Sequence, residues 1–82
     1  MKLASFRSNI ESEIRLGIIH DDVMIDMESW GIENGMDLPS TMLEFIDLGS
    51  IAVKAVAETL KDVQPRQLVG TSIPLSSAII DN

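Results

Sequence analysis

Two short apolar segments of alternating polarity, separated by a polar turn, constrain this chain more than any other feature. In the first segment, residues 14–19, Leu16 and Ile18 fall on one side of an extended backbone. The second segment, residues 23–27, alternates in the same way. His20-Asp21-Asp22 between them are residue types that tolerate tight turns. The pattern predicts an antiparallel β-hairpin.

A third strand is predicted at the start of the chain, over residues 2–7. The polar residues 8–13 that follow suit a connection between neighbouring strands. Residues 28–38 contain two glycines, Asn34 and Asp37, which favours a loop. In the tail, residues 68–82, Pro74 argues against a central strand but permits an edge strand. Either Val69 and Ile73 or residues 78–80 could pair briefly with the sheet.

Two helices are predicted in the second half, over residues 40–48 and 51–63. Thr41 and Glu44 match a capping box, in which each side chain accepts a backbone N–H at the helix start, although Ser40 is an alternative cap. Gly49 ends the first helix, Ser50 caps the second and Pro65 follows it. The apolar positions expected to face the sheet are Met42, Phe45, Ile46, Val53, Val56, Ala57, Leu60 and Val63.

These elements predict one α+β domain over residues 1–82. We expect a small antiparallel sheet of three or more strands, packed in two layers against two α-helices. Hydrophobic residues make up 45% of the chain and charged residues 23%, which is typical of a folded protein rather than a disordered one. With so few residues the core is expected to be thin.

The charge distribution excludes some partners. The net charge is -7, and ten of the thirteen carboxylates lie between Glu11 and Asp47, where Arg15 is the only basic residue. Nucleic acid and anionic membrane surfaces are therefore not expected as partners. The chain has no cysteine, and no apolar segment approaches the length of a membrane-spanning helix. We expect a cytoplasmic location.

The order and spacing of five segments resemble the N-terminal domain of fumarylacetoacetate hydrolase-family enzymes. The segments are residues 1–7 (MKLASFR), 15–19 (RLGII), 23–27 (VMIDM), 39–49 (PSTMLEFIDLG) and 73–80 (IPLSSAII). The resemblance implies that this chain is a noncatalytic part of a longer enzyme, a metal-dependent hydrolase, isomerase or decarboxylase of small oxo or hydroxy carboxylates. A free-standing acidic protein-protein interaction module is the alternative.

The same resemblance places the chemistry outside this chain. The family's catalytic domain follows the segment equivalent to residues 73–80 and carries a Gly-x-Asn-Tyr-x-x-His-x-x-Glu motif with acidic ligands for Mg²⁺ or Mn²⁺. This chain has no tyrosine and one histidine. We therefore expect no catalytic, cofactor-binding or metal-binding residue and no cofactor here. The expected partner is the downstream catalytic domain, and a second copy of the protein in a homodimer is a further alternative.

Several polar residues are candidate sites. His20, Asp21 and Asp22, with Asp26 nearby in sequence, could hold a divalent ion, but a solvated turn is favoured. This set is the basis of a third hypothesis, a small metal-binding protein. The acid pairs Glu11 with Glu13 and Asp26 with Glu28 are expected to be surface acids.

Three other groups of residues have structural interpretations. Ser76-Ser77 lacks the surroundings of a nucleophile, and Gly31 and Gly35 are expected to be turn residues rather than a phosphate loop. The third group, the apolar set near the predicted loop, is either core or a docking surface, with core favoured. Its members are Met27, Trp30, Met36 and Met42.

Overall fold

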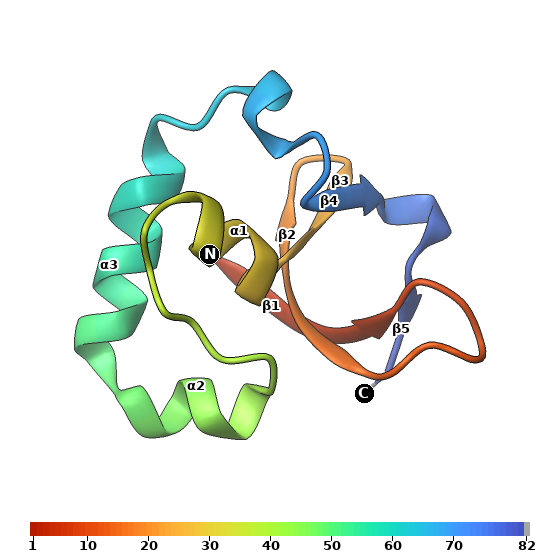
Figure 1. Cartoon of the computed structure of the whole chain (residues 1–82), viewed down its shortest axis with the longest axis horizontal. Helices are drawn as coiled ribbons and strands as arrows, with labels where there is room; N and C mark the ends of the chain where they lie inside the picture. Colours follow the sequence, from red (N-terminus) through yellow and green to blue (C-terminus); the bar gives the residue numbers. More distant parts are fainter. Residues whose placement is uncertain (82) are drawn as a thin grey trace.

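A five-stranded antiparallel sheet with the strand order β4-β3-β2-β1-β5 organises the computed structural model, which describes residues 1–81 (Figure 1). The strands are β1 (Lys2–Arg7), β2 (Arg15–His20), β3 (Val23–Asp26), β4 (Ser72–Pro74) and β5 (Ile79–Ile80). The α-helices are α1 (Met27–Glu33), α2 (Met42–Leu48) and α3 (Ser50–Lys61), and the 3-10 helices are η1 (Pro65–Leu68) and η2 (Leu75–Ser77). The predicted α+β class is confirmed, with three α-helices in place of two.

The hairpin of β2 and β3 forms in the register that the alternating pattern predicts. His20 lies opposite Val23, so Asp21 and Asp22 alone make the turn. Asp21 has a φ of 52°, in the left-handed region that aspartate and asparagine enter more readily than most residues. The turn chemistry therefore fixes which side chains of the two strands face the helices.

One face of the sheet packs against the helices and forms the larger core. Leu16, Ile18 and Ile25 project from β2 and β3 into it and are at most 1% exposed. The helical segments and the residues near them complete this core with Met27, Trp30, Leu38, Phe45, Val56, Leu60 and Leu68. Figure 1 shows α1 over the sheet, with α2 and α3 to one side of it.

The opposite face of the sheet also buries side chains, because the sheet curls (Figure 1). Ala4, Phe6 and Met24 form a second, smaller cluster there. Gly17 lies among them, since a Cβ at this position would come within 2.6 Å of the Met24 sulfur and 2.7 Å of the Phe6 ring. Glycine thus leaves the space that these two larger side chains occupy.

Residues 27–33 form α1, so the prediction of a loop over residues 28–38 is wrong for its first half. The predicted strand over residues 23–27 ends at Asp26, which caps the helix by accepting the Ser29 N–H at 3.3 Å. Gly31 suggested a loop, yet a Cβ there would lie 2.9 Å from the Leu38 side chain. Close packing in a helix, rather than turn geometry, explains this glycine.

The caps of α2 and α3 agree with the sequence only in part. Thr41 caps α2 by accepting the Glu44 N–H at 3.3 Å, as predicted. The Glu44 carboxylate accepts the Thr41 hydroxyl at 2.7 Å instead of a backbone N–H. Ser40 is not the cap. Gly49, with a φ of 79°, ends α2 and also precedes α3, so the prediction of Ser50 as the second cap is wrong.

The tail supplies both edge strands of the sheet. Ser72–Pro74 pairs with β3 and Ile79–Ile80 pairs with β1, which confirms the edge position of Pro74 and the pairing of Ile73 and of residues 79–80. Val69 does not belong to a strand. Asn82, the last residue of the predicted tail, lies outside the described residues. Among residues 1–81, no helix is long and apolar enough to cross a membrane.

Candidate functional site

The predicted metal candidates lie at the turn between β2 and β3. The His20 Nε2 atom is 3.9 Å from the Asp21 carboxylate, whose side chain is 92% exposed. Asp26 is at the far end of β3 from this turn. Within residues 1–81, no three histidine or acidic side chains are grouped so that they could hold a metal ion. The structure therefore confirms the turn but does not bring these residues together as a ligand set.

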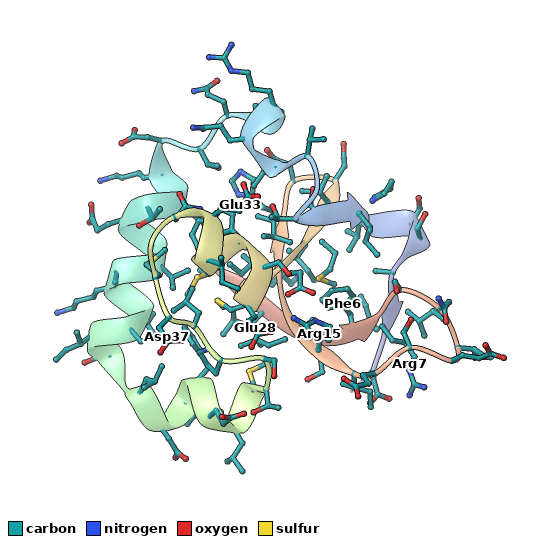
Figure 2. The ribbon with its side chains drawn as sticks, in the orientation of Figure 1. Phe6, Arg7, Arg15, Glu28, Glu33 and Asp37 are labelled. Carbon is teal, nitrogen blue, oxygen red and sulfur yellow. The ribbon has the colours of Figure 1, made fainter. Side chains whose placement is uncertain are left out.

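Asp26 and Glu28 come together on Arg15, the only basic residue in the acidic part of the sequence. The Arg15 Nε donates to Asp26 at 2.6 Å, and its Nη2 donates to Asp26 at 3.1 Å and to Glu28 at 2.9 Å. The hydrogen bonds that Arg15 donates to Asp26, and then those to Glu28, raise the pKa of its guanidinium above the ordinary value. Figure 2 shows Arg15 and Glu28 pointing toward each other beside α1.

This Arg15 cluster has a structural role that the sequence did not predict. Asp26 holds the guanidinium with one carboxylate and caps α1 with the same group, so the cluster connects β2, the end of β3 and the start of α1. The two acids were expected to be independent surface residues, but Asp26 is only 21% exposed and both are paired with Arg15. The isolation of Arg15 among ten carboxylates was the available signal.

A groove of about 400 Å³ opens beside the Arg15 cluster on the concave face of the sheet. Phe6, Met24 and Ile73 form its apolar part, whereas Arg15 and Asp26 belong to its polar part. Phe6 lies near Arg15 in Figure 2. Because Arg15 already bonds two carboxylates, its charge is neutralised within the protein rather than presented to a ligand.

The remaining predicted sites have ordinary structural positions. Glu11 is exposed in the connection between β1 and β2, and Glu13 lies on the rim of the same groove. Ser76 and Ser77 are exposed in η2. Gly35 has a φ of 71° just after α1 and is a turn residue, but Gly31 is buried within the helix, which corrects the prediction of a turn there.

The choice between core and docking surface for the tryptophan-methionine group is settled in favour of core. Trp30 and Met27 are at most 1% exposed, and Met36 and Met42 pack against the same cluster while remaining partly accessible. Two of the group belong to α1, whose formation turns Met27 and Trp30 toward the sheet. A methionine-rich exposed surface is therefore absent from this region of the described structure.

The exposed apolar side chains lie instead on α2 and α3. We define the outer helical surface as Leu43, Ile46, Leu48, Ile51 and Val53, whose exposed fractions range from 41% for Val53 to 82% for Ile51. All five fall between residues 43 and 53, on two helices joined at Gly49. Figure 1 places these helices at the side of the molecule away from β5.

The structure corrects the sequence prediction for three residues of α2 and α3. Ile46, Val53 and Ala57 were expected to face the sheet but are exposed. The inward positions of α3 are Val56 and Leu60, with Ala52 and Val63 packed partly against the core. The helical period was correct, but the width of the buried stripe was overestimated, because each helix contacts the core along one edge only.

Acidic side chains accompany this apolar surface. Glu44 and Asp47 are exposed on α2, and Glu58 is exposed on α3, with Lys54 as the basic residue between Ile51 and Glu58. Exposed aliphatic side chains surrounded by charged ones are typical of surfaces that contact another protein.

Comparison of the chain with protein-family models, curated proteins and solved structures finds no match.

Proposed function

We propose that this chain is the noncatalytic N-terminal domain of a fumarylacetoacetate hydrolase-type enzyme and supports the downstream catalytic domain by docking through the outer helical surface. The observation that carries the docking role is the exposure of five aliphatic side chains between residues 43 and 53. Burying such side chains against a partner removes apolar area from water and stabilises the assembly. The ordered resemblance of the five sequence segments supports the choice of parent enzyme.

In this proposal the parent enzyme acts on small oxo or hydroxy carboxylates by hydrolysis, isomerisation or decarboxylation. Its Mg²⁺ or Mn²⁺ would be held by carboxylates of the downstream domain. The described residues of this chain do not fit that metal, since no three histidine or acidic side chains are grouped among them. In this proposal the N-terminal domain contributes packing and orientation, and the downstream domain carries out the chemistry.

The reading frame after Asn82 tests the choice of parent. A frame that continues into a Gly-x-Asn-Tyr-x-x-His-x-x-Glu motif would support the proposal. A frame that continues into an unrelated sequence, or a stop codon directly after Asn82, would contradict it.

The docking role is tested in the full polypeptide by hydrogen exchange. Ile46→Asp with Ile51→Asp should increase exchange in α2 and α3, because a buried carboxylate disfavours docking. Ile32→Asp is the matched control, since Ile32 is 70% exposed on α1 and lies outside the outer helical surface. Equal exchange in both variants, or full exchange of α2 and α3 already in the unsubstituted protein, would contradict the docking role.

A free-standing acidic interaction module is the second candidate. It uses the same outer helical surface but binds a separate protein, and the excess of carboxylates in residues 11–47 favours a basic partner. A stop codon after Asn82 favours this candidate. Sedimentation then distinguishes a homodimer, with about twice the 9.0 kDa mass of the chain, from a monomer that needs a different partner.

A further inference from the structure

A second groove, of about 600 Å³, lies where η1 and the connection between α3 and η1 meet the turn between β2 and β3. Its apolar lining includes Val23, Val63, Leu68 and Ile73, which come from four different elements or connections. The volume is within the range of about 300–1,000 Å³ that is common for ligand sites. In Figure 1 this region is at the opposite end of the molecule from α2. The groove is therefore separate from the outer helical surface.

One end of this groove carries negative charge. Asp21 and Asp22 both line it and both are exposed. None of its described lining residues is a Lys or Arg. His20 is beside Asp21, but its Nε2 is 3.9 Å from that carboxylate, beyond hydrogen-bond distance. A cationic group arriving from solvent would thus meet two carboxylates that have no Lys or Arg partner among residues 1–81.

The groove also runs along the edge strand β4. The Asp26 N–H donates to the Thr71 carbonyl and the Leu75 N–H donates to the Asp22 carbonyl, each at 2.7 Å. This register turns the backbone groups of Ser72 away from β3, toward the open edge of the sheet. Ser72 can therefore offer one N–H and one C=O to an extended segment. Pro74 offers only a carbonyl, so the added pairing must be short.

These features indicate which kind of ligand fits the groove. An apolar lining with carboxylates at one end complements a segment in which a Lys or Arg side chain is close to an aliphatic one. The net charge of -7 attracts such a segment and repels a second copy of this chain or an anionic membrane. The exposed edge of β4 favours an extended peptide backbone over a compact small molecule.

We propose that this groove is a binding site for a short extended peptide of a partner protein, with an aliphatic side chain on Val23, Val63 and Val69 and a Lys or Arg side chain at Asp21 and Asp22. This site is distinct from the outer helical surface and does not depend on the choice of parent enzyme. It gives the molecule a second contact at the opposite end from α2.

The experiment uses the full chain and a fluorescein-labelled peptide of alternating lysine and leucine, followed by fluorescence anisotropy. Asp21→Asn with Asp22→Asn should weaken binding about tenfold, as expected for two exposed charge pairs lost together. Asparagine tolerates the left-handed backbone at position 21, so the turn is retained. Val69→Ser should weaken binding about threefold without unfolding the protein, because Val69 lines the groove and is 79% exposed.

The matched control is Glu11→Gln with Glu13→Gln, which removes the same charge from the connection between β1 and β2. At about 0.15 M salt it should change the affinity less than twofold, because distant exposed charges are screened. Amide shifts on peptide addition should fall on residues 20–23 and 63–74. Equal weakening in both double variants, equal binding of a glutamate-leucine peptide, no binding of the lysine-leucine peptide, or shifts confined to α2 and α3 would each overturn the proposal.

Discussion

The inner and outer sides of α2 and α3 both carry apolar side chains, but in different surroundings. On the inner side, Phe45, Val56 and Leu60 pack with the sheet and are at most 7% exposed. On the outer side, Leu43 is 71% exposed and Ile51 is 82% exposed. The difference arises because a helix at the edge of a small domain contacts the core along one stripe only. Apolar residues beyond that stripe are available to a partner rather than to the fold.

The largest expected effect on the free energy of unfolding comes from removing a large buried side chain on the inner side. Phe45→Ala should lower the free energy of unfolding by about 3–5 kcal/mol, because it leaves a cavity in the larger core. Urea unfolding followed by the fluorescence of Trp30, the single tryptophan and a neighbour in that core, measures the change. Leu43→Ala, on the same helix, is the control and should change it by less than about 0.5 kcal/mol. Similar losses in the two variants would remove the distinction between the sides.

The next effect tests the smaller core on the concave face of the sheet. Gly17→Ala should cost about 1–3 kcal/mol, because the added Cβ would overlap Phe6 and Met24. Phe6→Leu should recover part of that loss in the double variant, since it removes ring atoms near the new methyl group. A double-mutant cycle from urea unfolding measures this coupling. Strict additivity would show that Gly17 is not required by this packing.

A smaller effect on the free energy of unfolding is expected at the N-terminal cap of α2. Thr41→Ala should cost about 1 kcal/mol, because the Glu44 N–H loses its acceptor. Thr41→Ser should keep most of the stability. Ser40→Ala is the control that separates the two candidate caps, since Ser40 uses its backbone carbonyl to accept the Leu16 N–H. A larger loss in Ser40→Ala than in Thr41→Ala would reverse this assignment.

The smallest effect on folding is expected on the outer side itself. Ile46→Ser with Ile51→Ser should change the free energy of unfolding of the isolated chain by no more than about 0.5 kcal/mol per site, because both side chains already contact water. Thermal unfolding monitored by circular dichroism checks this. A loss as large as that of Phe45→Ala would mean that these residues stabilise the fold and are not free to dock.

The same contrast shows which parts of the fold were predictable. The hairpin followed from local pattern, since alternation and the Asp21-Asp22 turn specify the register without distant contacts. Helix α1 was missed because Gly31 is atypical of helices. The glycine at position 31 is explained by the close approach of the Leu38 side chain, and a local sequence pattern does not reveal that contact. The exposure of Ile46 was missed for a related reason, because periodicity gives the direction of a helical face but not how much of it is covered.

The candidate sites divide in the same way. The turn at His20-Asp21-Asp22 could be assigned from residue types, whereas its position at the end of an apolar groove depends on Val63 and Leu68, more than forty residues further along the chain. The pairing of Arg15 with Asp26 and Glu28 joins a strand to a helix start that was not predicted. The isolation of Arg15 indicated that a partner was needed but could not identify which of ten acids it would be.

The amino-acid sequence by itself determined the hairpin, the first strand, the two later helices, the edge position of Pro74 and the strongly acidic character of residues 11–47. These properties depend on neighbouring residues, so backbone preference and polarity pattern are enough to specify them. Only the tertiary structure decided which aliphatic side chains of α2 and α3 are covered and which acids pair with Arg15. It also decided how the tail completes a groove beside the turn between β2 and β3. Burial and charge pairing depend on residues from distant parts of the chain, and only folding brings those residues into contact.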